Sequence, residues 1–129
     1  MKEIRFSVYT ILIKNGKFLM LLREKPNVWE FPGGGIEFGE HPEKTAKRET
    51  YEETGLNVNV KLFTIGSCIY PNKKIQQISI FYLGEPIKFN EIKIKEHLKY
   101  KWFSLGEIKE LNNLALSVKA ILRKLKDLI

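Results

Sequence analysis

Runs of β-branched and aromatic residues, several of them alternating with polar residues, predict a protein that is rich in β-strands. The predicted strands are Ile4–Ile13, Phe18–Arg23, Val58–Ile69, Ile75–Leu83 and Tyr100–Phe103. The dipeptide Asn15-Gly16 indicates a two-residue hairpin turn between the first two strands. The segment Pro71–Lys74 is expected to turn the chain between the next pair.

Helical patterns lie between and after these strands. The first helix is predicted to begin near Pro42, a favourable first helical position, and to end before Gly55, because glycine suits a helix C-terminus. A short helical turn capped by Ser104 is expected at Gly106–Leu111, and the last helix is expected to start near Asn113. The last helix carries an apolar stripe that we expect to pack in the core. The stripe comprises Val118, Ile121, Leu122, Leu125 and Leu128.

The order of these elements predicts an α/β protein in which helices pack on a mixed sheet. The 129 residues suit a single domain, residues 1–129. The chain shows no signal-peptide pattern and no apolar run near the roughly 20 residues that span a bilayer, so a soluble cytoplasmic protein is expected. The single cysteine, Cys68, excludes an internal disulfide and a cysteine-based zinc site, and we expect it to be buried.

The first helix carries an acidic face that local stability does not explain. Glu49, Glu52 and Glu53 lie three and four residues apart, so their side chains are neighbours on one face. Like charges at these spacings repel, and the helix dipole disfavours negative charge near the C-terminal end. A divalent cation would offset this charge, because magnesium and manganese prefer carboxylate oxygens. The alternative is a solvated acidic surface that pairs with the basic residues of the same helix.

A glycine-rich segment precedes this helix at a fixed spacing. The short segment Trp29–Gly35 ends in three glycines, which allow a backbone to approach a ligand closely. From Gly34, five residues lead to Glu40, and seven more lead to the run RETYEETGL, residues 48–56. This arrangement resembles the Nudix box, a pattern of glycine, five residues, glutamate, seven residues, Arg-Glu, an aliphatic residue, any residue, Glu-Glu, any residue, glycine and an aliphatic residue.

The match to the Nudix box is nearly complete. The matching residues are Gly34, Glu40, Arg48, Glu49, Glu52, Glu53, Gly55 and Leu56. The departure is Thr50, where the family has an aliphatic residue, and we expect slightly poorer packing there rather than lost chemistry. The flanking runs WEFPGGG and YKWFSLGEI, which end at Gly35 and Ile108, also resemble the family, so the resemblance covers most of the chain.

The resemblance implies an α/β/α sandwich around a mixed sheet and a hydrolase that cleaves the diphosphate bond of a nucleoside diphosphate linked to another group. It implies Mg²⁺ or Mn²⁺ as the cofactor, with Glu52 and Glu53 as the main ligands. Glu49 is implied either as a further ligand or as the base that activates water. A backbone carbonyl of Gly33 or Gly34 is implied to assist the metal.

Other site residues are also carried over by position. Arg48 is implied to orient a glutamate through an ion pair. Glu40 is implied to support the site from the N-terminal side of the helix, and we count it among the candidate substrate-binding residues. Arg23 matches a position at which some family members contact phosphate, and the alternative is a surface arginine. Phe31 is a candidate for stacking on a base, although aromatic residues pack in cores by default.

A glutamate outside the box is a further candidate. Glu96 lies six residues before Trp102, in the predicted loop Gly84–Leu98. MutT-type members carry an extra metal-binding or base-like glutamate at the similar position, and Glu91 is the reserve candidate. The alternative for Glu96 is an ordinary surface residue.

The substrate is open at this level. The MutT-like flanks favour a nucleoside or deoxynucleoside triphosphate that loses pyrophosphate. Pro71 resembles a proline of ADP-ribose-cleaving members, and Tyr70 resembles a tyrosine of diadenosine-polyphosphate hydrolases, so these substrates are alternatives.

Functions of another class are also open. A non-catalytic Nudix module that binds nucleotides or RNA is an alternative, although the intact glutamates favour an enzyme. The net charge of +7 does not by itself predict nucleic-acid binding, because the basic segments are scattered. RNA decapping uses the same box and stays open. Because many family members dimerise, a homodimer is also open, whereas a membrane partner is not expected.

Overall fold

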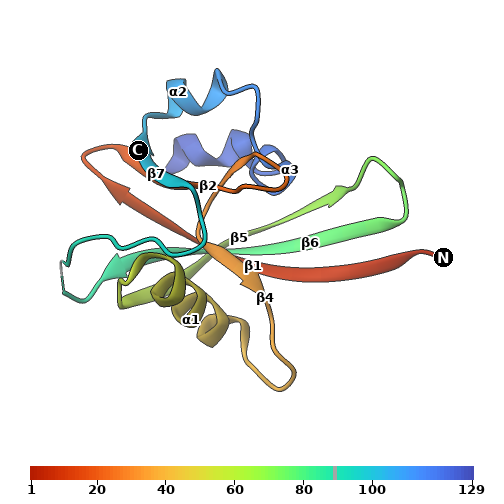
Figure 1. Ribbon diagram of the computed structural model, residues 1–129, viewed down its shortest axis with the longest axis horizontal. Helices are drawn as coiled ribbons and strands as arrows, with labels where there is room; N and C mark the ends of the chain where they lie inside the picture. The colour runs from red at the N-terminus through yellow and green to blue at the C-terminus, as the bar shows by residue number, and fades with distance from the viewer. Residues whose placement is uncertain (89) are drawn as a thin grey trace.

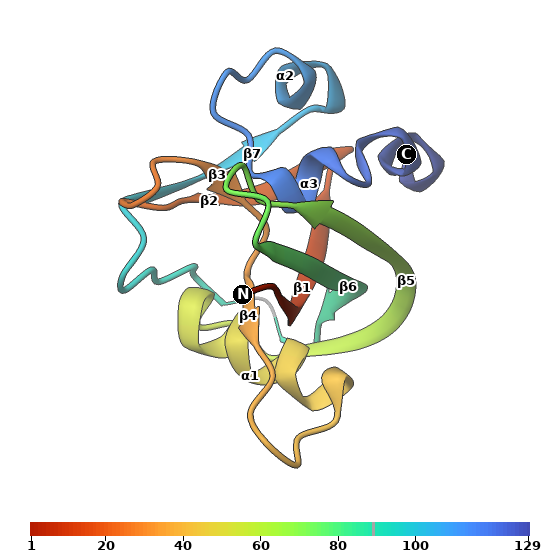
Figure 2. The same cartoon turned by 90° about the vertical axis from the view of Figure 1, so that its right-hand side faces the viewer.

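The computed structural model describes residues 1–88 and 90–129 and shows a mixed sheet with helices on both sides. Its strands are β1 (Glu3–Lys14), β2 (Lys17–Leu22), β3 (Trp29–Glu30), β4 (Gly33–Gly35), β5 (Val58–Ile69), β6 (Ile75–Pro86) and β7 (Lys99–Phe103). Its helices are α1 (Pro42–Thr54), α2 (Leu105–Lys109), α3 (Leu116–Lys119) and the 3-10 helix η1 (Leu122–Leu128). Helix α1 lies on one side of the sheet, and α2 and α3 lie on the other (Figure 1). The view turned by 90° shows the same three layers (Figure 2).

Strand β1 is the centre of the sheet. The strand order is β3-β2-β1-β6-β5, with β4 also paired to β1 and β7 also paired to β2. β1 runs parallel to β6 and antiparallel to β2 and β4, which makes the sheet mixed. It pairs with β4 through residues 7–9 but with β2 only through Ile13 and Lys14. The other strands therefore take their positions from β1.

Both faces of β1 are buried over residues 8–12, and this burial fixes the register of the sheet. On one face, Tyr9 and Ile11 belong to the main core, which also holds apolar residues of α2, α3 and η1. On the other face, Val8 packs with Ala46 of α1 and with Tyr82. These two cores confirm the predicted α/β arrangement with a mixed sheet between helices.

The end of the chain differs from the prediction of one continuous helix. It forms two short pieces, α3 and η1, and Ile121 between them has a φ of −121°. The predicted stripe still packs in the core, since Val118, Ile121 and Leu125 are buried. Burial at spacings of three and four residues suits either one helix or two short ones, so periodicity does not locate the break.

Two other predictions are corrected by strands β5 and β6. β6 continues to Pro86, past the predicted end at Leu83, because its antiparallel partner β5 continues to pair there through Val58. Cys68 of β5 is half-buried rather than buried, because this end of β5 extends beyond the helices, and its neighbour Ile69 is 63% exposed.

Residue 89 of the predicted loop lies outside the described residues. Among the described residues, no helix is both long and apolar enough to cross a bilayer.

The buried face of α1 is made of small residues. Thr45, Ala46 and Thr50 are fully buried against the sheet. The Thr50 Oγ1 atom lies 2.6 Å from the Ala46 carbonyl oxygen and 2.7 Å from Thr10 Oγ1 of β1. Thr50 therefore donates to Ala46, and the Thr10 hydroxyl is placed to donate to Thr50. The threonine in place of an aliphatic residue is thus matched by a polar partner on β1.

This pair of hydroxyls is expected to couple α1 to β1. Thr50→Val should lower the free energy of unfolding by about 1 kcal/mol, because Thr10 keeps only a longer contact with Ala46. That contact is 3.4 Å long. Thr10→Val should lower the free energy of unfolding by a similar amount. The double variant should lose less stability than the sum of the two single losses, since two apolar side chains then meet. Urea unfolding of the four proteins measures the coupling, and strictly additive losses would show that the hydroxyls do not interact.

Candidate active site

Helix α1 has the boundaries that the sequence predicts. His41 caps its N-terminus, because His41 Nδ1 accepts a hydrogen bond of 3.0 Å from the Glu43 backbone N–H, and Pro42 follows as the first helical residue. Gly55 ends the helix in the left-handed conformation, with a φ of 78°, and donates to the Tyr51 carbonyl at 2.8 Å. With its small residues against the sheet, α1 turns its glutamates toward a cleft.

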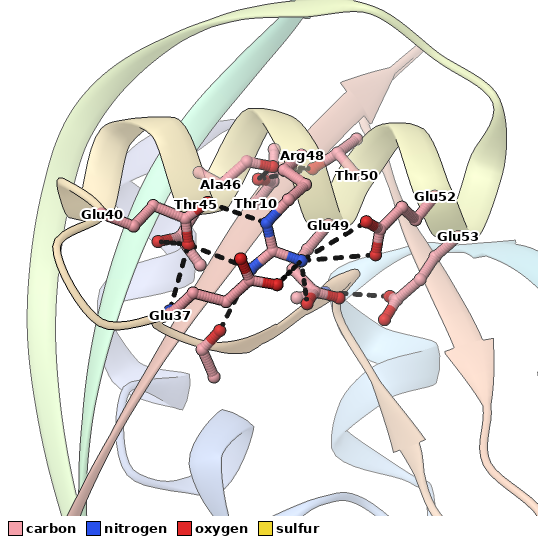
Figure 3. Close-up of polar contacts among 12 residues, drawn as sticks. Thr10, Glu37, Glu40, Thr45, Ala46, Arg48, Glu49, Thr50, Glu52 and Glu53 are labelled. Carbon is pink, nitrogen blue, oxygen red and sulfur yellow. Dashed lines mark hydrogen bonds and ion pairs between the residues drawn. The ribbon is translucent and has the colours of Figure 1, made fainter.

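Arg48 lies at the centre of the charged residues of α1 (Figure 3). Its guanidinium donates to Glu40 at 2.8 and 3.0 Å and to Glu49 at 2.8 Å. It also forms an ion pair of 3.3 Å with Glu52, one turn further along the helix. Arg48 therefore neutralises part of the repulsion between the glutamates and fixes the orientation of Glu49, which is the geometry expected for its orienting role.

Glu40 supports Arg48 rather than facing a ligand. Its carboxylate accepts hydrogen bonds from Arg48, from Thr45 Oγ1 at 2.7 Å and from the Glu37 backbone at 3.2 Å, and its side chain is 8% exposed. The Arg48 and Thr45 hydrogen bonds lower the pKa of Glu40 to about 2, and Glu40 in turn raises the pKa of Arg48. This geometry favours the supporting role of Glu40 at the N-terminal side of the helix, and its assignment to substrate binding stays a prediction.

Glu53 is the buried member of the acidic face. Its Oε1 atom accepts a hydrogen bond of 3.0 Å from the Gly33 backbone N–H. Burial, opposed by this hydrogen bond and assisted by the charges of Glu49 and Glu30, raises the pKa of Glu53 to about 9. A cation beside this carboxylate would reverse the shift by stabilising its charged form.

The glycine strand β4 turns alternate backbone groups toward α1. The Gly33 N–H donates to Glu53, and the Gly35 carbonyl accepts from Arg48 at 3.3 Å. Within a strand, the N–H and C=O of one residue point to the same edge, and this edge alternates from residue to residue. The Gly33 carbonyl therefore faces α1, whereas Gly34 pairs with Val8 of β1. Of the two glycine carbonyls that the sequence left open, this geometry favours Gly33 as a metal ligand.

The acidic side chains of α1 offer the type of ligand atom that a hard divalent cation binds. Glu49, Glu52 and Glu53 offer carboxylate oxygens, which Mg²⁺ and Mn²⁺ prefer. Among residues 1–88 and 90–129, no three acidic, histidine or cysteine side chains already stand in a coordinating arrangement. Arg48 holds Glu49 and Glu52, so metal binding requires the Glu52 side chain, which is 53% exposed, to rotate toward Glu53.

Glu96 lies with these glutamates in one hollow, which we call the acidic cleft. It has a volume of about 260 Å³ and is lined by Glu49, Glu52, Glu53, Lys95 and Glu96. The reserve candidate, Glu91, lines a different hollow beside Tyr51 and Lys93. The structure thus brings Glu96, and not Glu91, to the acidic face of α1.

A larger hollow, which we call the arginine cleft, continues from the acidic cleft. Its volume is about 510 Å³, and it shares Glu53 and Glu96 with the acidic cleft. Its lining includes the arginines and lysine Arg5, Arg23 and Lys25, next to the glutamates Glu24, Glu30, Glu53 and Glu96. Arg23 is half-exposed here, with its guanidinium 3.7 Å from the Glu30 carboxylate. The structure therefore places Arg23 where an anionic group next to the acidic cleft would lie.

A third hollow, which we call the apolar cleft, continues in the other direction. Its volume is about 490 Å³, and Pro26, Val28 and Leu114 are among its lining residues. The arginine cleft and the apolar cleft share a wall that is made of Tyr9, Arg23, Glu30, Tyr70 and Gln77. In this wall the Tyr70 hydroxyl donates to Gln77 at 2.5 Å, and Gln77 donates to the Tyr9 hydroxyl at 3.0 Å. Charged and apolar surfaces therefore follow one another along one continuous groove.

Phe31 does not line this groove. Its side chain is fully buried, and its ring packs against Phe18 and Phe81 in the main core, with centroids 6.4 and 6.3 Å away. This burial corrects the assignment of Phe31 to substrate binding. In the sequence, Phe31 lies close to the glycines. Successive side chains of an extended chain point to opposite faces, so Phe31 points into the core while its neighbour Glu30 faces the groove.

Glu30 and His97 are among the groove residues that the sequence analysis missed. Glu30 and His97 both line the arginine cleft, and His97 Nε2 lies 2.9 Å from the Glu30 carboxylate. Both side chains are 9% exposed, and His97 Nδ1 is buried without a hydrogen-bond partner among the described residues. An acidic residue between Trp29 and Phe31, inside an otherwise apolar segment, was a signal that could have pointed to a functional carboxylate.

The close approach of β4 to α1 makes a test of the metal site possible. A Cβ atom added at Gly34 would lie 2.7 Å from the Glu49 carboxylate carbon, whereas one added at Gly35 would meet nothing within 4 Å. We therefore expect Gly34→Ala to displace Glu49 and to weaken Mn²⁺ binding by about 10-fold or more, with Gly35→Ala as the matched control. Calorimetric titration with Mn²⁺ measures this effect. Equal Mn²⁺ affinities in the two variants would show that Glu49 takes no part in metal binding.

Comparisons with known proteins show the family to which this chain belongs. A family model described as the NUDIX domain matches residues 1–125. The MutT-like protein of Streptomyces ambofaciens is 29% identical over 100 residues, which are 78% of this chain and 63% of that protein. The RNA pyrophosphohydrolase of Blochmanniella floridana is 35% identical over 91 residues, which are 70% of this chain and 52% of that protein. This chain therefore spans only about half to two-thirds of the length of these two relatives.

Other similar proteins match over most of their length. The 8-oxo-dGTP diphosphatase of Buchnera aphidicola subsp. Acyrthosiphon pisum is 33% identical over 103 residues, which are 79% of this chain and 81% of that protein. The crystal structure of the MutT protein from Methanosarcina mazei covers 98% of this chain and 95% of its own, with a TM-score of 0.84 and 24% identity, and so shows the shared fold. With the family model spanning nearly the whole sequence, this chain belongs to the Nudix family.

Proposed function

We propose that this protein is a metal-dependent hydrolase that cleaves the diphosphate bond of a nucleoside diphosphate linked to another group. The observation that carries this proposal is the convergence of Glu49, Glu52, Glu53 and Glu96 on one cleft, which continues into a groove with arginines and then an apolar surface. A diphosphate needs positive charge around it, and a base or other apolar group needs a dry surface. The arginine cleft supplies Arg5, Arg23 and Lys25 beside glutamates whose charge a bound metal ion would offset, and the apolar cleft follows it.

The residues of the groove divide the chemistry between them. A bound Mg²⁺ or Mn²⁺ ion would neutralise phosphate charge and acidify bound water. Glu49, Glu52 and Glu53, with the Gly33 carbonyl, are the groups that we assign to hold the ion. Arg48 keeps Glu49 oriented toward the same cleft. Glu96 is exposed in that cleft, and we assign it to accept the proton of the attacking water, because Glu49 is already engaged by Arg48.

We propose a nucleoside or deoxynucleoside triphosphate as the substrate, with pyrophosphate as a product. Arginine donors suit phosphate oxygens, so Arg23 is assigned to the phosphates in the arginine cleft. The apolar cleft next to it, about 490 Å³ in volume, is assigned to the base. The relatives named 8-oxo-dGTP diphosphatase and RNA pyrophosphohydrolase support a substrate that carries nucleoside phosphates. Dinucleoside polyphosphates, ADP-ribose and the 5′ end of RNA are the alternatives that the test below distinguishes.

Several predictions from the sequence are not tested by these observations. They are a single domain over residues 1–129, a cytoplasmic location, the homodimer that the sequence left open and the absence of a nucleic-acid partner. They remain predictions.

The proposed activity is tested by measuring phosphate and pyrophosphate release from a substrate panel with Mg²⁺ or Mn²⁺. The panel contains nucleoside triphosphates, ADP-ribose, diadenosine polyphosphates and RNA with a triphosphate or capped 5′ end. Glu52→Gln and Glu53→Gln should abolish metal-dependent turnover, because each removes a carboxylate charge from the metal site. Glu43→Gln is the matched control, since Glu43 is an exposed residue of the same helix and does not line the acidic cleft. Absence of turnover on every compound by folded, metal-binding protein would contradict the proposal.

The support for Arg48 gives a separate prediction. Glu40→Gln keeps an acceptor for Thr45 but removes the charge that holds the Arg48 guanidinium, so kcat should fall by about 10- to 100-fold. Glu37→Gln is the control, because Glu37 contacts Arg48 only at 3.7 Å and its side chain is 71% exposed. Steady-state kinetics on the best substrate decide between the two carboxylates. Equal effects of both substitutions would show that general charge, and not the orientation of Arg48, is what matters.

A further inference from the structure

The segment that carries Glu96 has little structure of its own. Residues 90–98, all of which the structure describes, form neither helix nor strand. Two backbone hydrogen bonds of 2.9 Å attach this segment to the rest of the protein: the Lys93 N–H donates to Thr54 of α1, and the Leu98 N–H donates to Leu22 of β2. Glu96 lies between these attachments and is exposed. Backbone attachments on either side do not by themselves hold a side chain at a reacting atom.

The residue next to Glu96 makes the nearest side-chain attachment. His97 Nε2 lies 2.9 Å from Glu30 Oε2, and both side chains are 91% buried, with 9% exposed. Glu30 is a rigid partner, because it pairs with Leu21 in the sheet. The neighbouring residue Trp29 also holds this strand in place, because its ring packs edge-on against Phe103, with ring centroids 4.8 Å apart. The hydrogen bond therefore connects the irregular segment directly to a fixed wall of the groove.

We propose that Glu30 and His97 are positioning residues, whose hydrogen bond holds the neighbouring Glu96 at the acidic cleft in reach of the attacking water. This inference rests on the proposed function, because it assigns Glu96 to the chemistry. A buried hydrogen bond to a carboxylate is strong and directional, and a displacement of about 1 Å at a catalytic group costs about 100-fold in rate. The alternative is that His97 and Glu30, which line the arginine cleft, bind the substrate directly.

Kinetics distinguish positioning from substrate binding. His97→Leu removes the hydrogen bond and should lower kcat by about 10- to 100-fold with little change in KM. His97→Gln places an amide donor near the position of Nε2 and should restore most of the rate. His41→Asn is the matched control, because the other histidine of the chain only caps α1 and asparagine keeps a cap. A rise in KM at constant kcat in His97→Leu would overturn the proposal in favour of substrate binding.

A double-mutant cycle tests whether His97 acts through Glu96. In the wild-type background, Glu96→Gln should lower kcat by about 100-fold or more. In the His97→Leu background the same substitution should have a much smaller effect, since Glu96 is already displaced. Additive losses, or no loss for Glu96→Gln in the wild type, would overturn the proposal.

A second measurement does not depend on turnover. Amide hydrogen exchange of residues 93–98 should be faster in His97→Leu than in the wild type and near wild-type in His97→Gln, while the amides of α1 and the Mn²⁺ affinity stay unchanged. Unchanged exchange in His97→Leu would overturn the positioning role. If the wild-type protein hydrolyses nothing on the panel, the proposed function fails, and the exchange result still decides whether Glu30 and His97 hold the segment.

Discussion

The close packing of α1 against β1 and β4 is the constraint on which the site depends. Only small residues, such as Ala46 and Thr50, lie between the helix and the sheet, so the helix backbone comes near the glycine strand. At this distance Gly33 hydrogen-bonds Glu53 directly. A larger residue on either side would separate the acidic side chains from the backbone groups that complete the site. The lack of large apolar residues on α1, which weakens the helix alone, is thus what allows this approach.

Electrostatics explain how so much negative charge is tolerated on one helix. Arg48 contacts Glu40, Glu49 and Glu52, and so it compensates part of the repulsion within the protein itself. Glu53 is buried beside Glu49 and is not among these partners of Arg48, so a cation bound there would favour its charged form. The acidic face therefore has two parts. Glu49 and Glu52 are held in place by Arg48, whereas the charge of Glu53 would be stabilised by a bound cation.

The groove forms where β1 changes its partners. One edge of β1 pairs with β4 through residues 7–9 and with β2 only at its end, so β2 and β3 diverge from β4. Tyr9 of β1, Arg23 after β2 and Glu30 of β3 line the space along this divergence. The acidic face of α1 closes one end, and Leu114 lies at the other. A substrate with a charged and an apolar part fits this order of surfaces.

Local chemistry and fixed spacing let the sequence determine several features. The bounds of α1 followed from Pro42 and Gly55, and the carboxylate face followed from the helical repeat, because both depend on neighbours within a turn or two. The core role of the final apolar stripe was also predictable, although its break into two pieces was not. Thr50 stood out as a departure from the family pattern, but its partner Thr10 lies 40 residues away.

The tertiary structure alone decided which residues reach the groove. Glu30 and His97 are 67 residues apart and meet because β3 and the segment before β7 both lie beside β2. Phe31 is directed into the core and Glu40 toward Arg48 by the same packing. Such contacts depend on strand order and register, which bring distant segments together and which no local periodicity encodes. The sequence by itself therefore determined the bounds and the charge pattern of the acidic helix, and only the fold decided what surrounds it.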